Sequence, residues 1–289
     1  MKHYLKLIRI DQYVKNAFVF APLFFGGAFL DLHLTVKVLG AFICFSLAAS
    51  SIYIINDIFD IKEDQAHPLK SKRPLAAGII SKNKAIIIQI VLMSCAIILS
   101  WIISEELFAI IGAYIVLNFF YSKWLKHIAI LDINIIAVGF VLRILAGAVV
   151  SVIVPSIWIL LITYLLALFL GIAKRRTDVI LAQNGQEVRK NIEGYNLSFI
   201  DTVLGILASV IVVCYIFYCI APENQKHYHS NLLYISIIFV INGIFRYLKL
   251  AIVNQSTHSP TQIVLTDRFI QITILLWILL MSYLLYFNI

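Results

Sequence analysis

Nine long apolar runs, separated by short polar segments, decide what this chain can fold into. Hydrophobic residues make up 62% of its 289 residues and charged residues only 13%, too apolar a balance for a water-soluble domain. A helix that crosses a bilayer needs about 20 mostly apolar residues, and backbone groups in lipid must bond internally, so we expect an all-α membrane bundle. The predicted spans are residues 17–30, 38–55, 85–103, 107–120, 128–153, 157–173, 199–221, 232–250 and 269–287.

The cationic residues lie almost entirely on one side of these nine runs. Of the 23 Lys and Arg residues, 20 fall before the first run or in loops on that same side. Lys37 and Lys226 fall on the opposite side, and Arg143 lies inside the fifth run. Loops rich in Lys and Arg stay in the cytoplasm, so we expect a cytoplasmic N-terminus in a bacterial plasma (inner) membrane. The Lys and Arg residues of the predicted cytoplasmic face account for the net charge of +8, so no nucleic-acid partner is needed to explain it.

The longer loops, about residues 56–84, 174–198 and 251–268, all fall on the predicted cytoplasmic side. The loops on the other side are short and carry little charge. We therefore expect one transmembrane domain over residues 1–289, with these three loops capping an active site that faces the cytoplasm.

The acidic stretch NDIFDIKED, residues 56–64, follows the second run directly. If the helix continues through it, Asn56, Asp60 and Asp64 share one face, with Asp57 beside them. Carboxylates about 6 Å apart repel by roughly 3 kcal/mol at an effective dielectric constant near 20, so something must offset their charge. Mg²⁺ would do so, since it binds one or two carboxylates together with substrate phosphates. The alternative is a solvated acidic helix end balanced by nearby lysines.

The segment HPLKSKRPLAAG, residues 67–78, places Lys70, Lys72 and Arg73 just after the acidic stretch. A metal site with adjacent cations is a recurring arrangement for binding a diphosphate. An ordinary positively charged cytoplasmic loop would explain these charges but not their position beside the carboxylates.

Two further basic clusters end apolar runs on the same face. YSKWLKH, residues 121–127, contains Tyr121 and Lys126, and GIAKRRTD, residues 171–178, contains Lys174, Arg175 and Asp178. Lysines at the ends of membrane helices often extend to lipid headgroups, which is the alternative to a role in substrate binding.

Asp132 and Arg143 differ from these clusters because they lie inside the fifth run, eleven residues and three helical turns apart. A charge at the centre of a span costs about 2.5–3.5 kcal/mol, so both side chains must face a partner or a cavity. A structural ion-pair role and a substrate-cavity role both remain open.

Taken together, these motifs resemble a known family. NDIFDIKED resembles the NDxxDxxxD motif of the UbiA-type intramembrane prenyltransferase superfamily, and YSKWLK resembles its second recurrent motif. Members of that family are nine-helix bundles whose central cavity opens laterally to lipid under cytoplasmic loops. The resemblance therefore implies that fold here.

The resemblance is stronger to one branch of the family, the decaprenyl-phosphate phosphoribosyltransferases. It rests on RIDQYVKNAFVFAPL, NDIFDIKEDQAHPLKSKRPLAAG, YSKWLKHIAILDINIIAVGFVLRILAGA, LGIAKRRTDVIL, EGYN and LTDR. The branch implies transfer of phosphoribose from phosphoribosyl diphosphate to a polyprenyl phosphate, for the synthesis of cell-envelope glycan precursors.

The residues and the resemblance together predict a site that depends on Mg²⁺. The sequence leaves open whether the protein forms a homo-oligomer. The predicted metal ligands are Asn56, Asp60 and Asp64; the predicted catalytic residues are Asp57, Asp60, Tyr121 and Asp132; and the predicted substrate-binding residues are Lys15, Asn16, Arg73, Lys126, Arg143, Lys174, Arg175 and Asp178.

Two other functions stay open at this point. An aromatic prenyltransferase of the same fold would use a prenyl diphosphate, but such enzymes carry a second acidic motif, DxxxD. The corresponding loop here, KRRTDVILAQNGQE, has Asp178 and no DxxxD. An anion transporter usually has internal repeats and interrupted helices, and neither is visible in this sequence.

Overall fold

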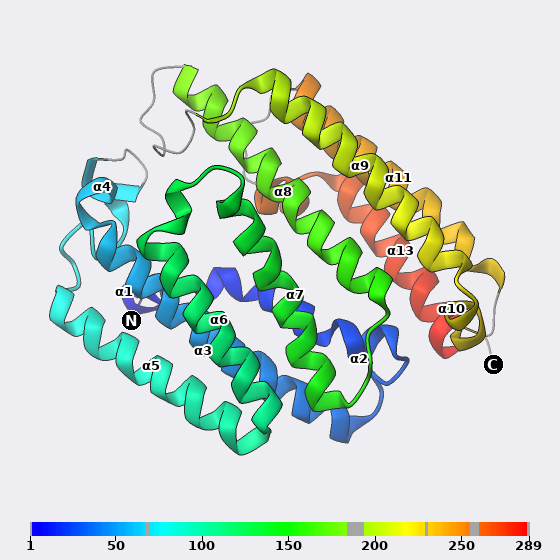
Figure 1. The fold of residues 1–289 in the computed structure, drawn as a ribbon, viewed down its shortest axis with the longest axis horizontal. Coiled ribbons are helices and arrows are strands. Elements are labelled where there is room, and N and C mark those ends of the chain that lie inside the picture. The colour runs from blue at the N-terminus through cyan, green and yellow to red at the C-terminus, as the bar shows by residue number, and fades with distance from the viewer. Residues whose placement is uncertain (1, 67–69, 184–193, 229–230, 255–259, 288–289) are drawn as a thin grey trace. The chain divides into compact units, whose positions relative to one another are not determined.

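The computed structural model describes residues 2–66, 70–183, 194–228, 231–254 and 260–287. In these ranges every regular element is a helix. The chain divides into two compact units, Met1–Pro155 and Ser156–Ile289, and each is described by itself (Figure 1). The predicted single domain stays a prediction.

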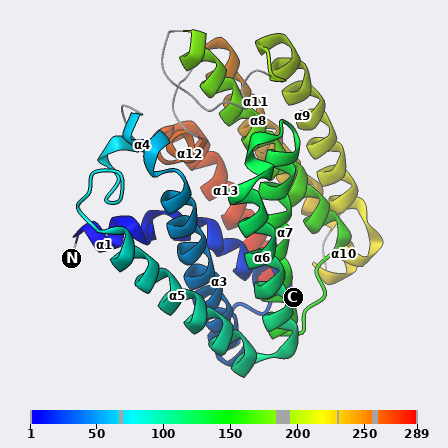
Figure 2. The same cartoon turned by 60° about the vertical axis from the view of Figure 1, so that its left-hand side comes forward.

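The first unit is built around one long helix, α3, with α5 packed along it in both views (Figures 1 and 2). Helices α6 and α7 also contact α3, and η1 packs on α3 and α7. Its elements are α1 (Lys2–Leu7), η1 (Ile10–Phe20), α2 (Ala21–Phe25), α3 (Leu32–Phe59), α4 (Ile61–Ala66), η2 (Lys70–Lys72), α5 (Lys82–Ile103), α6 (Glu105–Lys123), η3 (Leu125–His127) and α7 (Leu131–Ser151).

Short polar side chains set the starts of the long helices. The Asp31 carboxylate accepts a hydrogen bond from the backbone N–H of Leu34 and so caps α3. Ser104 ends α5 and caps α6 at once, because its extended backbone turns the chain and its hydroxyl accepts from the N–H of Leu107. One residue therefore separates two adjacent helices.

The core of the first unit lies where η1, α3, α6 and α7 meet. It is formed by buried apolar residues that include Val19, Phe45, Leu107 and Ile111. Gly147 permits the close approach of α7 to η1, since a Cβ atom there would lie 1.8 Å from the Val19 carbonyl oxygen. This contact sets how deeply η1, with its polar residues, packs into the unit.

The second unit is a smaller helical bundle in which α8 packs along α9, and α11 packs on α13. Asn196 caps α9, and Asp267 caps α13 by accepting from the N–H of Ile270. Its elements are α8 (Ile157–Gln183), α9 (Leu197–Ile220), α10 (Pro222–His227), η5 (Asn231–Ser236), α11 (Ile237–Leu248), the π-helical turn η6 (Lys249–Val253), α12 (Pro260–Thr266) and α13 (Arg268–Tyr286).

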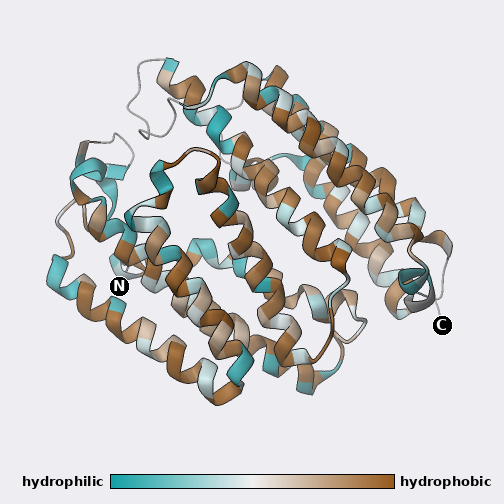
Figure 3. Cartoon of the chain, in the orientation of Figure 1, coloured by the Kyte–Doolittle hydropathy of each residue, from teal (hydrophilic) through white to brown (hydrophobic). Residues whose placement is uncertain are grey.

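Eight helical segments of the described residues are long and apolar enough to cross a membrane, and they match eight of the nine predicted spans. Their residues are predominantly apolar, and many of the polar ones lie toward the helix ends (Figure 3). The predicted first span, residues 17–30, instead forms the end of η1, the short helix α2 and the turn that follows. The ninth crossing therefore stays a prediction.

The acidic stretch is helical, with one interruption. α3 ends at Phe59, Asp60 is its C-cap residue, and α4 begins at Ile61. Backbone hydrogen bonds still link Asp60 to Asn56 (3.0 Å) and Asp64 to Asp60 (2.7 Å). The α-helical assignment is therefore interrupted at a single residue, Asp60, while the i to i+4 hydrogen bonding continues through it.

Candidate functional site

Arg73 joins two of the four predicted acidic-face residues. Its Nη1 atom lies 3.0 Å from Asp57 Oδ1 and 2.7 Å from Asp64 Oδ2. Both carboxylates are buried. Two like charges are held together here by one guanidinium, and the hydrogen bond from the Arg73 N–H to the Lys70 carbonyl (2.9 Å) fixes the loop that carries it.

Arg9 is a second cation on Asp57, and the sequence analysis did not single it out. Its guanidinium contacts the same Asp57 oxygen as Arg73 and lies 4.8 Å from the centroid of the Tyr53 ring. Arg9 has a left-handed backbone (φ 54°) immediately before η1, which is uncommon for a residue with a side chain. Its place in RIDQYVKN, inside a recognised motif, was the available signal.

Asp60 forms a separate group with Asn56 and Lys126. The Asn56 side-chain amide donates to Asp60 Oδ2 at 3.1 Å, and the Lys126 ammonium pairs with Asp60 Oδ1. Lys126 comes from η3, just after α6. The structure thus brings Lys126, predicted as a phosphate ligand, directly onto the acidic motif.

The donor atoms of this region partly match the predicted metal site. Asn56 and Asp60 are adjacent and offer amide and carboxylate oxygens, the ligand type that Mg²⁺ prefers. Asp64 instead lies with Asp57 on Arg73. In the described part of the chain, no three His, Cys, Asp or Glu residues lie close enough to hold a metal by themselves. The residues therefore fit an ion that also takes ligands from substrate phosphates.

A polar network lies inside the first unit, between η1, α3 and α7. The Arg143 Nε atom donates to Asn16 Oδ1 at 2.8 Å, and the Asn16 amide donates to Ser46 Oγ at 2.9 Å. Arg143 also donates to the Gly139 carbonyl and lies against three aromatic rings, among them Phe45 at 4.7 Å. Two residues predicted from different motifs, Asn16 and Arg143, are thus in direct contact.

Lys15 adds a further positive charge beside this network. Its pKa is lowered to about 8, first by burial and then by the positive charges of Arg143 and Arg9. Lys15, Arg9 and Arg143 therefore repel one another, and a bound anion would relieve that repulsion.

Two other predicted residues take different positions in the first unit. Asp132 is fully buried in the first turn of α7, and Tyr121 is half-buried in the last turn of α6. Both lie near η3, the segment that carries Lys126. Ile130, the residue before α7, has φ 70°, a strained conformation for a β-branched side chain.

In the second unit, the predicted residues Lys174, Arg175 and Asp178 lie on the last turns of α8. Asp178 pairs with the buried Arg175 at 2.7 Å, three residues away, while Lys174 is exposed. The charge of the single acidic residue in this segment is thus balanced within its own helix.

Two ion pairs in the second unit were not predicted. Arg176 pairs with Asp201 of α9 at 2.7 Å and donates to the Ala251 carbonyl in η6 at 2.6 Å. Arg246 pairs with Asp267 at 2.7 Å and holds the pKa of that carboxyl below its usual range. Asp267 belongs to the quoted LTDR motif, which was the available signal for it.

Comparisons with known proteins identify the family of this chain. Residues 18–269 match the UbiA prenyltransferase family. The chain is 33% identical to decaprenyl-phosphate phosphoribosyltransferase of Mycolicibacterium smegmatis, over 98% of this chain and 92% of that protein. It is 30% identical to the protein of the same name from Corynebacterium glutamicum, over 95% and 84%.

A solved structure shares the fold. The structure of a UbiA homolog from Archaeoglobus fulgidus bound to GPP and Mg²⁺ has a TM-score of 0.71 over 98% of this chain and 99% of that one, at 19% identity. The fold family expected from the motifs is confirmed.

Proposed function

Because the chain belongs to the UbiA prenyltransferase family, we propose that it transfers a 5-phosphoribosyl group from phosphoribosyl diphosphate to a polyprenyl phosphate and releases diphosphate. The structural observation that carries the proposal is the meeting of Arg9, Arg73 and Lys126 on the carboxylates of the acidic motif. Cations and oxygen ligands in one place suit a diphosphate leaving group.

The same residues suit a resident Mg²⁺, for which Asn56, Asp60 and Asp64 are the proposed ligands. Asn56 and Asp60 already lie together, and the homolog from Archaeoglobus fulgidus was solved with Mg²⁺. When bound, the ion neutralises charge on the diphosphate. Asp57 holds Arg9 and Arg73 close to the motif, so its proposed role is to position these two guanidinium groups.

The reaction needs charge stabilisation and positioning more than proton transfer. The bond between ribose C1 and the diphosphate oxygen breaks, and its electron pair leaves with diphosphate. Arg73 stabilises that departing charge. An oxygen of the lipid phosphate forms the new bond to C1. Because this oxygen is already anionic near neutral pH, no general base is required.

The remaining anionic groups need cations of their own. Lys15 is the proposed site for a further phosphate of the donor, because positive charge exceeds negative charge there. Arg143 and Asn16, which hydrogen bond to each other, lie beside it. Asp132 and Tyr121 are proposed to contact the ribose. Lys174, Arg175 and Asp178 are proposed substrate-binding residues of the second unit.

We place the active site on the cytoplasmic side of a bacterial plasma membrane, in a nine-span bundle. Phosphoribosyl diphosphate is a soluble donor and would reach the acidic motif from the cytoplasm. The prevalence of Lys and Arg in the loops on this side supports that orientation.

The test is direct incorporation. Purified protein receives labelled phosphoribosyl diphosphate, Mg²⁺ and polyprenyl phosphate, and lipids are then extracted. We expect label in the lipid fraction and an equal amount of diphosphate. Label that stays in the aqueous phase, while a prenyl diphosphate and an aromatic acceptor give product, would support aromatic prenyl transfer instead. The Arg175–Asp178 pair, and the lack of a second DxxxD motif in KRRTDVILAQNGQE, weigh against that alternative.

A further inference from the structure

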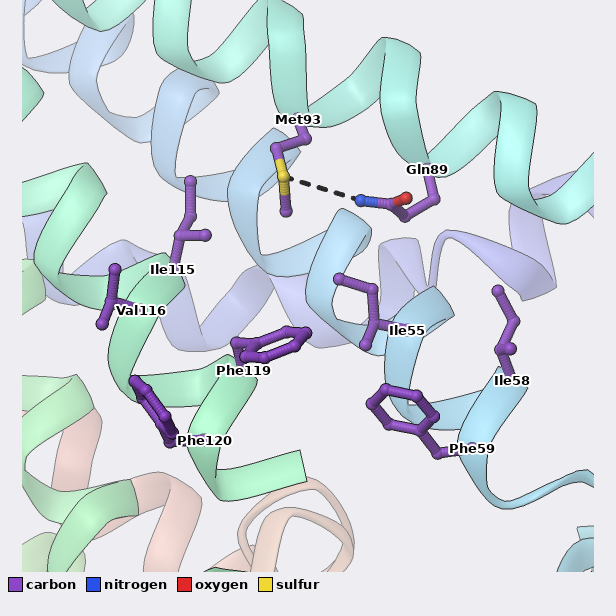
Figure 4. A pocket seen from close by; sticks show the side chains of 9 residues that line it. All are labelled: Ile55, Ile58, Phe59, Gln89, Met93, Ile115, Val116, Phe119 and Phe120. Carbon is purple, nitrogen blue, oxygen red and sulfur yellow. Dashed lines mark hydrogen bonds between the residues drawn. The ribbon is translucent and has the colours of Figure 1, made fainter. Parts of the chain in front are cut away.

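An apolar groove of about 460 Å³ lies between α3, α5 and α6 (Figure 4). Its size falls in the usual range of ligand pockets. Ile55, Ile58 and Phe59 line it from α3, Met93 from α5, and Val116 and Phe120 from α6. Three of these six side chains, Phe59, Val116 and Phe120, are exposed, so the groove is open along the apolar surface of these helices.

The groove lies next to the acidic motif, at the C-terminal end of α3. Its α3 wall, Ile55 to Phe59, alternates with Asn56 and Asp57 along the last turns of that helix. The wall from α6 is the last part of that helix, ending at Lys123. One helix, α3, therefore presents an apolar face to the groove and a polar face to the site.

Cations lie just beyond the aromatic end of the groove. The Phe120 ring stacks on Trp124 at 5.6 Å, and the Lys123 ammonium lies 4.1 Å from the centroid of the Trp124 ring. Lys126, two residues after Trp124, pairs with Asp60 of the acidic motif. An amphipathic molecule in the groove would place its hydrocarbon chain against the apolar walls and its polar head near Trp124, Lys123 and Lys126.

We infer that this groove binds the first isoprene units of the polyprenyl phosphate acceptor, with its phosphate beside Lys123 and Lys126. The inference rests on the proposed function and adds a route for the acceptor's hydrocarbon chain. A phospholipid tail would satisfy the apolar walls equally. The polyprenyl phosphate is favoured because the cation that follows the groove, Lys126, is also bound to the acidic motif where its phosphate must react.

Val116→Trp tests the inference by filling the groove. Val116 is 56% exposed, so the larger side chain can be accommodated without disturbing a core. We expect the KM for a long polyprenyl phosphate to rise on the order of tenfold, while the KM for phosphoribosyl diphosphate stays unchanged. Butyl phosphate, which lacks the chain, should be used equally by both proteins.

Val91→Trp is the matched control. Val91 is 54% exposed on α5 and does not line the groove, so the same substitution should leave both KM values unchanged. An acceptor KM that is equal in the Val116→Trp and wild-type proteins would overturn the inference. Wild-type protein that transfers no phosphoribose at all would instead overturn the proposed function.

Photo-crosslinking provides a readout that does not depend on turnover. With benzoylphenylalanine at position 116 and labelled polyprenyl phosphate in mixed micelles, we expect a labelled adduct that excess unlabelled acceptor removes. The same probe at position 91 should give none. An adduct at position 116 that only phospholipid competes away would assign the groove to a membrane lipid and contradict the inference.

Discussion

Asp60 is the C-cap residue of α3, and its carboxylate pairs with Lys126. Asp60→Asn keeps the shape of the side chain but removes the charge that Lys126 contacts and that the proposed Mg²⁺ would need. We expect kcat/KM to fall about 100- to 1,000-fold with little change in thermal stability, as assayed by lipid labelling at saturating Mg²⁺.

Glu63→Gln is the control for Asp60→Asn, because Glu63 lies on the adjacent α4 and is exposed. It should retain near wild-type activity. Equal losses in the two variants would show that general negative charge, and not Asp60 itself, supports transfer.

Arg73 is the residue on which two buried carboxylates converge. Arg73→Ala leaves Asp64 without this partner and removes a cation proposed for the diphosphate. We expect the KM for phosphoribosyl diphosphate to rise at least about tenfold and more than the acceptor KM, together with a lower melting temperature. The neighbouring Lys72 is exposed, so Lys72→Ala should change either KM little. A donor KM that stays at the wild-type value in Arg73→Ala would remove Arg73 from the donor site.

If Lys15 binds a donor phosphate, as proposed, donor binding should depend on pH. Its folded-state pKa of about 8 lies below its ordinary value of 10.5, so charged Lys15 is disfavoured in the free protein. An anion bound beside it would raise that pKa. Binding should therefore be independent of pH below about 8 and weaken as pH rises from there, where donor phosphates no longer change charge.

The Lys15→Arg variant separates this effect from other titrations. Arginine stays charged over the whole range, so donor affinity measured by titration calorimetry between pH 7 and about 10 should be flat. If wild type and Lys15→Arg lose affinity in parallel, a different group controls the pH dependence and Lys15 does not bind the donor.

At the scale of the helices, the packing of η1 on α7 depends on Gly147. In Gly147→Ala the new methyl group would meet the Val19 carbonyl oxygen, a backbone atom that cannot rotate away. We expect a clearly lower melting temperature in detergent and loss of activity, since η1 carries Lys15 and Asn16. Gly112→Ala in α6, where nothing lies within 4 Å, should be neutral or gain up to about 1 kcal/mol from helix propensity. Similar melting temperatures for the two variants would contradict this account.

Helix positions followed from the sequence because hydrophobic length is a strong signal. The predicted runs 85–103 and 199–221 differ from α5 and α9 by a few residues at most. Side-chain partners did not follow, because they depend on contacts distant in sequence: Arg9 with Asp57 is 48 residues apart, and Arg143 with Asn16 is 127. The motif marked Asp57 and Asp60, but not that the two carboxylates pair with different cations.

At the scale of the whole molecule, the number of crossings depends on η1 and α2. A 3₁₀-helix rises about 2.0 Å per residue and an α-helix about 1.5 Å, so their 11 and 5 residues span about 30 Å if they lie end to end. The turn that follows α2 adds to this length, so the path can cross the roughly 30 Å hydrocarbon layer of a bilayer with Asp11 and Lys15 at its cytoplasmic edge. A segment too short to cross as an α-helix is thus long enough to do so in this conformation.

This makes the side on which the N-terminus lies a test of the ninth span. If η1 and α2 cross, the N-terminus and the acidic motif share the cytoplasmic side; if they do not, the two lie on opposite sides. In a background without the native cysteines, we expect Lys2→Cys and Glu63→Cys to resist a membrane-impermeant thiol reagent in intact cells. Val154→Cys, in the highly exposed turn after α7, should react with it. Labelling of Lys2→Cys together with Val154→Cys would reduce the protein to eight crossings, and α3 would then be its first span.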